Sequence, residues 1–540
     1  MAKIRFSKKE FEKYCKIDSK VLEKIAMFGT PVDDFEDELE IEIFPNRPDL
    51  ISLTGFMRGF NAFMEKEKGM RKYKINSPEK NFKVQIDKSV EKVRPFTACA
   101  IVKGLKFDDS KIKEIMNLQE KLHATLGRNR KKVAIGVYPM EKIVLPIRYE
   151  ARAPDKIKFM PLESDHEMTG MQIIRQHPKG KEYAHLLEGN SVFPVFVDAS
   201  KKILSMPPII NSQETGKVDE NTKDVFVECS GNDFETLKKA LNIVVTALSD
   251  LGGKIFSMEL DYNGKKEITP SFEPEKIKIS LENVNKLIGL ELKEKDLDKL
   301  LPKMGYEYSK GTVSIPSWRT DILHEVDIIE DIAIAYGYDN LVPEIPKVAT
   351  IGEESKESVV KSKISEILSG LGLIEVSSLH LMKNEELKNM KQKESEAVVL
   401  MDSKTDYKLL RNSLMAPAMR ILLGNKNHEY PQRIFEIGNV FVPGNPVREE
   451  SRLLIADVPS NFTELKQMVD YLMRMLNIKY EIKDANIPSM IDGRTASIIL
   501  NGKNVGFIGE VHPEILDNWN IKQPLAVLEI SLEEVFNHLK

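Results

Sequence analysis

The chain has 540 residues, of which 41% are hydrophobic and 30% are charged, and its net charge is −4. This composition predicts about three or four domains with a heavily charged surface, and it excludes a polycation that binds nucleic acid over its whole surface. Three widely separated cysteines without a C-x-x-C motif exclude a disulfide framework or a cysteine zinc site. With no apolar leader and no run of about 18 apolar residues, we expect a cytoplasmic protein without a membrane partner.

The first predicted domain covers residues 1–88 and reads as helix, helix, strand, turn and helix. Helical spacing of apolar residues is found in FSKKEFEKYC and SKVLEKIAMFG, and strand alternation in ELEIEIF. The two prolines of FPNRPDL indicate a turn, after which helical spacing returns in ISLTGFMRGFNAFMEK. The polar stretch SPEKNFKVQIDKS is interpreted as a linker.

The second predicted domain covers residues 89–268 and mixes helices with strands, which favours an α+β fold. Strands are predicted in TACAIVKGL, VAIGVY and DVFVECSG, and long helices in SKIKEIMNLQEKLHATLG and DFETLKKALNIVVTALSDLG. A basic turn follows the first of these helices and contains Arg128, Arg130, Lys131 and Lys132. These side chains are candidates for contacts with RNA phosphates, although a solvated turn explains them equally well.

The third predicted domain, residues 269–345, repeats the plan of the first. Two helices are predicted in SLENVNKLIG and KEKDLDKLLPKMG, and the strand TVSIPSWRTDI matches EIEIFPNRPDL, with proline, arginine and aspartate in the same order. Two copies of one unit are the simplest explanation, and such units resemble winged helix-turn-helix domains. The second helix of the later copy is too acidic to read DNA bases, so we expect it to contact protein.

Only the later copy contains an acid-rich helix, predicted over residues 319–338. Its apolar face is expected to consist of Ile322, Val326, Ile329, Ala333 and Tyr336. Its acids are Asp321, Asp327, Glu330 and Asp331. Carboxylates at this density repel one another unless a cation neutralises them, and their oxygens suit Mg²⁺. The alternative, which the spacing alone favours, is a solvated acidic turn stabilised by the helix dipole.

The fourth predicted domain, residues 355–540, follows a second linker, IPKVATIGEESKES. Helices are predicted in VVKSKISEILSGLG and NFTELKQMVDYLMRML, and a turn with a long helix in KTDYKLLRNSLMAPAMRILLGNKN. Strands are predicted in RIFEIGNVFV and in a hairpin of ASIILNG and NVGFIGEVH. The alternation indicates an antiparallel sheet, and no β-α-β phosphate-binding loop is present.

In this order the segments resemble the beta chains of phenylalanyl-tRNA synthetases, of the shorter archaeal and eukaryotic-like type. The resemblance is carried by FPNRPDLISLTGFMRGF, GRNRKKVAIGVY, MPPIINSQETGK, RTDILHEVDIIEDIAIAYGY, LLRNSLMAPAM, RIFEIGNVF and NVGFIGEVHPE. It implies a subunit of the ligase that uses ATP to attach phenylalanine to its tRNA, in a tetramer of two alpha and two beta chains. ATP and phenylalanine would be bound in the alpha chain.

The resemblance also refines the expected fold and the metal site. It implies an α+β multidomain chain with two winged-helix-like units, a mixed α/β editing domain and a C-terminal class II synthetase-like antiparallel sheet. In this family a D-x5-D-x2-E-[DE] pattern supplies magnesium ligands near the contact with the alpha chain. On this sequence the pattern falls on Asp321, Asp327, Glu330 and Asp331, and each position has a carboxylate.

The C-terminal domain lacks the phosphate-binding residues of an active class II core. Such a core needs an Arg-x-Glu strand and an arginine framed by glycines, because phosphoryl charge must be neutralised. Here Arg433 and Glu436 are one residue too far apart, and Arg494 lacks its glycine frame. We therefore expect a catalytically silent domain that pairs with an active alpha chain.

Family resemblance further implies that the central domain hydrolyses Tyr-tRNA, because a phenylalanine pocket rejects an added hydroxyl only about 100-fold. The candidate residues for this editing reaction are Asn211, Ser212, Glu228 and Ser230. We expect Glu228 to contact the tyrosyl hydroxyl or amino group, and Asn211 and Ser212 to position the water or the ester. Without the resemblance, ordinary polar turns would explain these residues better.

Two other functions fit parts of the sequence. One is a non-enzymatic scaffold that binds RNA or protein through the two winged-helix-like units, and the other is a free-standing aminoacyl-tRNA deacylase. The C-terminal domain and the complete carboxylate set favour the ligase subunit, because a deacylase alone needs neither.

Overall fold

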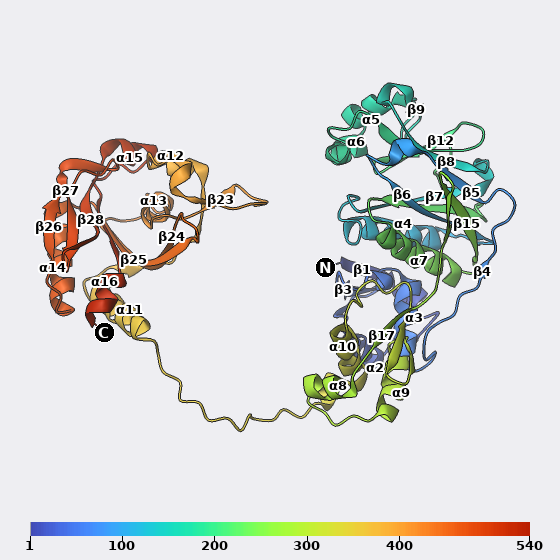
Figure 1. Ribbon diagram of the computed structural model, residues 1–540, viewed down its shortest axis with the longest axis horizontal. Coiled ribbons are helices and arrows are strands. Elements are labelled where there is room, and N and C mark those ends of the chain that lie inside the picture. The colour runs from blue at the N-terminus through green and yellow to red at the C-terminus, as the bar shows by residue number, and fades with distance from the viewer. Residues whose placement is uncertain (1, 540) are drawn as a thin grey trace. The chain divides into compact units, whose positions relative to one another are not determined.

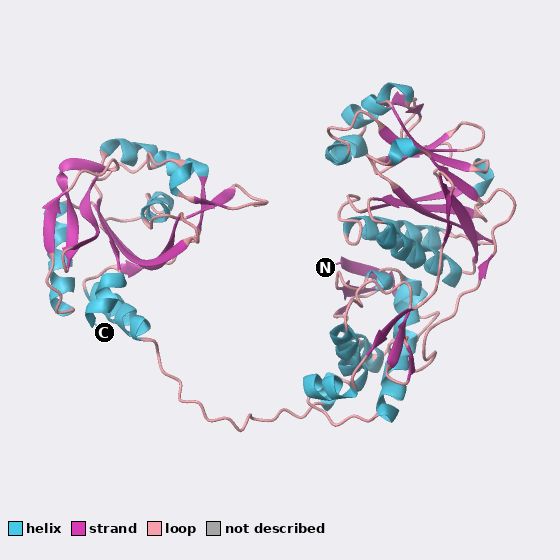
Figure 2. Cartoon of the chain, in the orientation of Figure 1, coloured by secondary structure: helices cyan, strands magenta, loops and turns pink. Residues whose placement is uncertain are grey.

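The computed structural model describes residues 2–539 and contains two compact units, Met1–Ile345 and Pro346–Lys540 (Figure 1). Helices and strands are mixed in both units (Figure 2), which agrees with the predicted α+β class. The segment between them, residues 341–355, contains no helix or strand. Within the described residues, no helix is long and apolar enough to cross a membrane.

The first unit begins with a three-stranded antiparallel sheet in the order β1-β3-β2. The first predicted helix is found as the short α1, and it is preceded by a strand over residues 2–7 that was not predicted. Ile4 and Phe6 are buried, whereas Lys3 and Arg5 point outward and bind Glu40 on the neighbouring strand. The elements are β1 (Ala2–Ser7), α1 (Lys8–Phe11), α2 (Ser19–Met27), β2 (Val32–Asp34), β3 (Glu38–Ile43) and α3 (Leu53–Phe63).

A second copy of this unit lies at the end of the first compact unit, as the repeated sequence pattern predicts. Its sheet has the corresponding strand order, β17-β19-β18, and both copies place two helices between their first and second strands. The elements are β17 (Glu275–Lys278), α8 (Leu281–Ile288), α9 (Glu294–Lys303), β18 (Glu307–Ser309), β19 (Thr312–Ile315) and α10 (Glu325–Tyr336). The acid-rich helix α10 therefore starts later than predicted, and Asp321 lies in the loop before it.

The two copies share one hydrophobic core. Phe56 and Phe60 of α3, Leu297 of α9 and Ile328 of α10 belong to the same buried cluster. The chain after α3 also crosses to the later copy, where the Gly69 amide donates to the carbonyl of Pro302 (2.8 Å). The repeats consequently pack together within one compact unit instead of forming two separate modules.

Between the copies in sequence lies an eleven-stranded mixed sheet, whose main path is β13-β12-β11-β8-β5-β15-β6-β14-β7. The predicted linker is in fact partly strand: residues 83–86 pair in parallel with β8 and β15, with Val84 and Ile86 buried. The strands are β4 (Ile75–Asn76), β5 (Lys83–Ile86), β6 (Phe96–Lys103), β7 (Val133–Pro139), β8 (Ile147–Arg152), β11 (Phe193–Val197), β12 (Ile203–Met206), β13 (Ile210–Asn211), β14 (Val225–Gly231), β15 (Lys254–Tyr262) and β16 (Lys265–Thr269).

Two long helices cover one face of this sheet near β6, β14 and β7 (Figure 1). They are α4 (Asp109–Ala124) and α7 (Phe234–Asp250), both as predicted. Val225, Val227 and Cys229 of β14 belong to the same buried cluster as these helices, so the alternate residues Phe226, Glu228 and Ser230 point to the opposite face. Two shorter helices, α5 (Gly170–Gln176) and α6 (Pro178–Tyr183), lie over the β11–β13 end.

The second compact unit is built on a seven-stranded sheet in the order β20-β24-β25-β29-β28-β27-β26, antiparallel except between β20 and β24. Its strands are β20 (Ile374–Glu375), β24 (Gln432–Val442), β25 (Arg448–Val458), β26 (Glu481–Asp484), β27 (Met490–Leu500), β28 (Lys503–Val511) and β29 (Ala526–Ser531). The predicted antiparallel character and the β27–β28 hairpin are confirmed.

Helices cover both faces of this sheet. Phe435 and Leu453 pack under α11 (Lys356–Gly370), α14 (Phe462–Met475) and α16 (Glu533–Leu539). Their neighbours in sequence, Ile434 and Leu454, face α12 (Asn384–Asn389), α13 (Met415–Gly424) and α15 (Pro513–Asn518). The predicted turn before α13 contains a strand, β23 (Tyr407–Leu410), which pairs with β21 (Leu381–Lys383) and β22 (Val398–Val399).

Candidate functional site

A largely apolar cavity of about 340 Å³ lies at the edge of the eleven-stranded sheet. Its apolar walls come from α4, from β7 and from the turn that joins β12 to β13. Two residues predicted from the sequence, Asn211 and Glu228, line it together. The cavity thus combines an apolar body with a polar end, the usual make-up of a specific small-molecule site. We call it the central cavity.

The polar end of the central cavity is organised around Glu228, which is 2% exposed. Its Oε1 lies 3.2 Å from the Tyr138 hydroxyl, and its Oε2 has no hydrogen-bond partner. Burial raises the pKa of Glu228 to about 8, against the opposing charge of Arg94. Glu228 is therefore mainly protonated at neutral pH and is able to donate as well as accept a hydrogen bond.

Tyr138 connects the two predicted residues. Its hydroxyl also lies 3.2 Å from Oδ1 of Asn211. The single hydroxyl proton of Tyr138 can be donated to only one of these two oxygens at a time, unless a protonated Glu228 donates to Tyr138 instead. The ring can reach this position because residue 136 is glycine: a Cβ there would lie 2.3 Å from the Tyr138 oxygen. The sequence analysis did not single out Tyr138, which ends a strand pattern that looked purely structural.

Ser212 and Ser230 do not line the central cavity, and their roles in editing stay predictions. Ser212 is buried beside Pro161, with which it forms an isolated β-bridge. The Ser230 hydroxyl accepts from Nε of Arg94 (3.2 Å), a buried arginine that covers this end of β14. Ser205 does not line the cavity either, although it pairs with Asn211 in the β12–β13 register.

The lining of the central cavity also contains a charged trio, Glu120, His123 and Arg130. A hydrogen bond from His123 holds the pKa of Glu120 low, at about 2, with Arg130 adding to the effect against burial. Burial lowers the pKa of His123, whose Nε2 accepts from the Ile135 amide (2.8 Å). This part of the lining therefore carries a carboxylate and a guanidinium that neutralise each other.

Arg130 is not available to RNA, contrary to the prediction for the basic turn. Its guanidinium is buried and donates to the Ile209 carbonyl (2.8 Å) and to Glu120 Oε1 (3.1 Å). The chain turns inward here through three consecutive left-handed residues, with φ of 47° at Arg128, 53° at Asn129 and 65° at Arg130. Arg128 and Lys131 remain exposed and line a second cavity of about 420 Å³ with Arg94 and His185. Lys132 is half-buried.

All four predicted metal ligands line one cavity of about 940 Å³, but four of their eight carboxylate oxygens already accept hydrogen bonds from the protein. Arg319 donates to both oxygens of Asp321 (2.8 and 2.7 Å). Asp331 Oδ2 accepts from Arg319 and from Tyr306, and Asp327 Oδ2 accepts from the amides of Leu323 and His324 (both 2.8 Å). Among the described residues, no group of three or more His, Cys, Asp or Glu side chains is arranged to hold a metal directly.

Glu330 differs from the other three acids because its carboxylate has no hydrogen bond or ion pair with the described residues. Burial and the nearby Asp331, Asp327 and Asp321 raise the pKa of Glu330. The opposite holds for Asp321: burial would raise its pKa, yet the adjacent Arg319 outweighs burial and holds the pKa below its usual value. The excess negative charge of this cavity is thus concentrated at Glu330, with unbonded oxygens Oδ1 of Asp327 and Asp331 nearby.

In the second compact unit, the two arginines considered as phosphate ligands, Arg433 and Arg494, are bound to carboxylates of the same unit. Arg433 Nε donates to Asp457 (3.1 Å), and Arg494 donates to Glu510 (2.7 Å). Glu436 is buried against Arg411, which donates to its Oε1 at 2.7 Å. These pairs leave no unpaired arginine at the positions considered for phosphate binding.

Two family models match this chain. The phenylalanyl-tRNA synthetase beta chain CLM domain matches residues 341–532, and the tRNA synthetase B5 domain matches residues 277–338, which contain the later copy of the repeated unit. Together they cover the end of the first compact unit and most of the second.

Whole-chain relatives are also found. The chain is 37% identical to a phenylalanine–tRNA ligase beta subunit of Archaeoglobus fulgidus, over 96% of this chain and 95% of the relative. It is 39% identical to one of Pyrococcus horikoshii, over 91% of this chain and 90% of the relative. Among solved structures, an N-terminal fragment of the Pyrococcus horikoshii phenylalanyl-tRNA synthetase beta subunit matches with a TM-score of 0.59 and 36% identity, covering 62% of this chain and 99% of the fragment.

Proposed function

Because the chain belongs to the family of phenylalanine–tRNA ligase beta subunits, we propose how its parts serve that enzyme. As such a subunit, the chain is part of an aminoacyl-tRNA synthetase of the translation machinery. Membership of this family implies an alpha partner and tRNA binding. We propose a tetramer of two alpha and two beta chains in the cytoplasm, with ATP and phenylalanine bound by alpha. Residues 1–88, 89–268, 269–345 and 355–540 are the proposed domains, the first and third of winged-helix type.

The proposed activity of the first compact unit is hydrolysis of Tyr-tRNA in the central cavity. The observation that carries it is the polar end of this cavity, where Glu228 and Asn211 form part of the lining and the Tyr138 hydroxyl lies 3.2 Å from an oxygen of each. An aromatic ring fits the apolar body, and the free Oε2 of Glu228 is available to the tyrosyl hydroxyl. Phenylalanine lacks that hydroxyl and would leave the buried Glu228 oxygen without a partner, which disfavours its binding.

The test is single-turnover deacylation of Tyr-tRNA by the assembled enzyme. Glu228→Ala is expected to slow hydrolysis about tenfold, because it leaves the tyrosyl hydroxyl without its partner in a buried site, which costs about 1–3 kcal/mol. Phenylalanine charging should be unchanged. The matched control is Glu235→Ala, an exposed acid at the start of α7. Equal deacylation by the Glu228 and Glu235 variants would remove Glu228 from the site.

We propose that the second compact unit is catalytically silent. Support comes from the ion pairs of Arg433 with Asp457 and of Arg494 with Glu510, which oppose binding of phosphate by either arginine. The two other functions considered from the sequence, a scaffold and a free-standing deacylase, are disfavoured because whole-chain relatives are ligase subunits.

For magnesium we propose a site at Glu330, with most ligands supplied by water. The carboxylate donors fit this ion, and Mg²⁺ commonly binds through only one or two carboxylates while keeping several waters. Asp327 and Asp331 could add their unbonded oxygens, whereas Asp321 would act through Arg319. A bound ion would supply the positive charge that this cavity lacks and would stabilise the start of α10.

Binding of magnesium is tested by thermal unfolding of the purified chain during a Mg²⁺ titration. The wild-type midpoint should rise with Mg²⁺, since a ligand that binds only the folded state stabilises it. Glu330→Gln should abolish the rise, and Asp298→Asn, which removes an exposed acid of α9, should not. A rise that persists in Glu330→Gln would place the ion elsewhere.

For tRNA we propose that Arg128, Lys131 and Lys132 contact the phosphate backbone, without Arg130. The exposed turn and the neighbouring cavity with Arg94 and His185 support this placement. Lys131→Glu with Lys132→Glu should weaken tRNA binding and reduce its salt slope by about one unit per lost contact. An unchanged slope would show that the turn is merely solvated.

A further inference from the structure

A small cavity of about 240 Å³, which we call the arginine cavity, lies between the two copies of the repeated unit. Arg47 and Arg58 reach it from the first copy, and Arg319 reaches it from the later copy. The exposed segment after α3 contributes Lys68 and Arg71. Its volume is below the range of about 300–1,000 Å³ found for drug-sized ligands, so it suits a small ion better than a nucleotide.

The repeat itself places two arginines at this cavity. In the first copy Arg47 donates to both oxygens of Asp49 (2.9 Å each). In the later copy Arg319 binds Asp321 with the same two nitrogens, Nε and Nη2. Each Arg-x-Asp pair follows the last strand of its sheet. The internal duplication therefore brings two equivalent guanidinium groups to one cavity.

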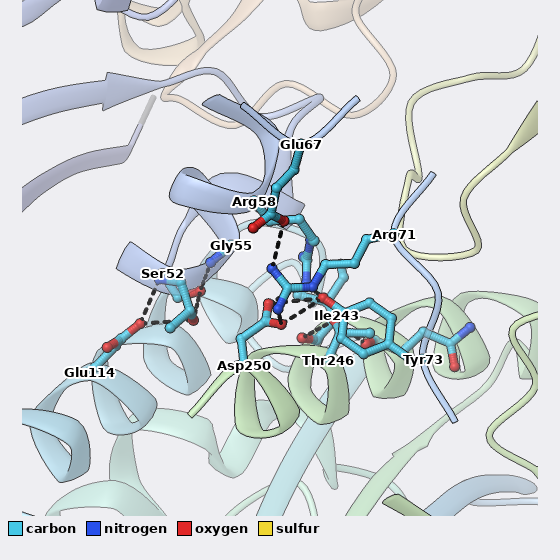
Figure 3. A network of polar contacts seen from close by, with 12 residues as sticks. Ser52, Gly55, Arg58, Glu67, Arg71, Tyr73, Glu114, Ile243, Thr246 and Asp250 are labelled. Carbon is cyan, nitrogen blue, oxygen red and sulfur yellow. Dashed lines mark hydrogen bonds and ion pairs between the residues drawn. The ribbon is translucent and has the colours of Figure 1, made fainter. Parts of the chain in front are cut away.

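The third buried arginine, Arg58, is fixed by a polar network (Figure 3). Its Nη1 donates to the Tyr73 hydroxyl (2.9 Å) and to Asp250 Oδ2 (3.0 Å), and Arg71 also approaches Asp250 (3.3 Å). The guanidinium carbon lies 4.8 Å from the ring centre of Trp318, which also lines the cavity. The guanidinium is thus held in place before any ligand arrives.

Two of these buried arginines have unused donors. Arg58 Nη2 and Arg319 Nη1 are buried and have no hydrogen-bond partner. Their carboxylate partners, Asp250, Asp321 and Asp331, do not line the arginine cavity. Leaving a buried donor unpaired is unfavourable, and more so when the group is charged. A ligand that accepts hydrogen bonds from both of these nitrogens would satisfy them.

We propose that the arginine cavity binds a phosphate-type oxyanion. The planar guanidinium presents N–H donors in a fork that matches phosphate oxygens, and three such groups converge here with Lys68 and Arg71 at the rim. Only Asp49 and Glu67 among the lining residues are acidic, and Asp49 is already bound to Arg47. The phosphate comes from solution, as inorganic phosphate or diphosphate, or from an RNA backbone.

The experiment measures ³¹P line broadening of inorganic phosphate by the full-length chain, with chloride keeping the ionic strength constant. The wild type should broaden the line at millimolar phosphate. Lys68→Gln with Arg71→Gln should weaken binding about threefold to tenfold, since two attractive charges are lost at the rim. Glu67→Gln removes a repulsive charge and should tighten binding. Lys66→Gln, an exposed residue of the same segment outside the cavity, is the matched control.

Arg58→Lys tests the buried donors, because it keeps a charge near Asp250 and removes Nη2. Weaker phosphate binding is expected. If this variant does not fold, the Lys68/Arg71 and Glu67 variants still test the proposal.

Adding tRNA distinguishes the two sources of phosphate. Release of bound phosphate assigns the cavity to an RNA backbone, and undisturbed phosphate binding assigns it to a free anion. Broadening that is identical in wild type, Lys68/Arg71 and Glu67 variants would overturn the proposal.

Discussion

Glu228 of the first compact unit and Glu436 of the second are both strand residues with about 2% of their surface exposed. Their partners differ. Glu436 receives hydrogen bonds on both oxygens, from Arg411 (2.7 Å) and from the Ser378 hydroxyl (2.7 Å). Glu228 has a tyrosine hydroxyl on one oxygen and nothing on the other, and it lines a cavity. The two buried carboxyl groups therefore differ in compensation: Arg411 bonds directly to Glu436, whereas no cation among the described residues bonds to Glu228.

The largest expected effect is at Arg411. Arg411→Ala leaves Glu436 buried without its counter-charge, so the free energy of unfolding of the second unit should fall by about 3–5 kcal/mol. Urea unfolding followed by Trp519 fluorescence, with Trp318→Phe as background, measures it. A loss below about 1 kcal/mol would mean that Glu436 does not depend on this pair and would break the contrast with Glu228.

The next effect is the pH dependence that Glu228 imposes. Its pKa is about 8 in the folded chain and 4.5 ordinarily, so between these values the folded state holds a proton that the unfolded state has lost. Stability of the first unit should therefore fall as pH rises from 5 to 8, by about 1.4 kcal/mol per pH unit at most, and then level off.

Glu228→Gln should flatten this fall, and Glu235→Gln should not. Unfolding followed by Trp318 fluorescence in a Trp519→Phe background provides the measurement. Identical pH profiles for wild type and Glu228→Gln would contradict the description of Glu228 as a buried, uncompensated acid.

A smaller effect is expected from Tyr138→Phe, which removes the only hydrogen-bond partner that the described residues offer to Glu228 Oε1. The free energy of unfolding should fall by about 1 kcal/mol, because Asn211 and Glu228 lose a donor together. Phe226→Leu at a neighbouring buried ring serves as a packing control in the same unfolding assay. If Tyr138→Phe also leaves Tyr-tRNA hydrolysis unchanged, the hydroxyl is only structural.

The smallest effect is predicted for an exposed pair in the second unit. Lys503 is mostly exposed and binds Glu534, so Lys503→Ala should change the free energy of unfolding by less than about 1 kcal/mol. The comparison of Lys503→Ala with Arg411→Ala in the same assay shows how much of the stability loss depends on the burial of the ion pair. Equal losses would show that burial does not set the size of the effect.

The sequence predicted the larger elements of the fold and failed for short strands. The repeat was visible because Arg47 and Arg319 occupy corresponding positions after a strand in each copy. Strand β1 was missed since its charged residues find their partner Glu40 about 35 residues away, and β5 was missed because its neighbours are β8 and β15, both distant in sequence. Pairing over such separations leaves little local signal.

The candidate site was predicted only in part, because several of its contacts join residues that are far apart in the sequence. Glu228 and Asn211 were chosen as polar residues at expected strand-to-turn positions, in the domain that the family resemblance assigns to editing, and both line the central cavity. Tyr138 was missed, since only folding brings its hydroxyl to Glu228 across 90 residues. Arg130 was taken for a surface residue because its acceptors, among them the carbonyl of Ile209, are 79 residues away.

The comparison of Glu228 with Glu436 leads to one central claim: the charged groups of the second unit stabilise its fold and activate no amino acid. Phenylalanine-dependent ATP–pyrophosphate exchange tests this directly, measured with the purified chain alone and after addition of its alpha partner. The account predicts no exchange by the chain alone and exchange after mixing. Exchange by this chain alone would contradict it and would make Arg433 and Arg494 candidate catalytic groups.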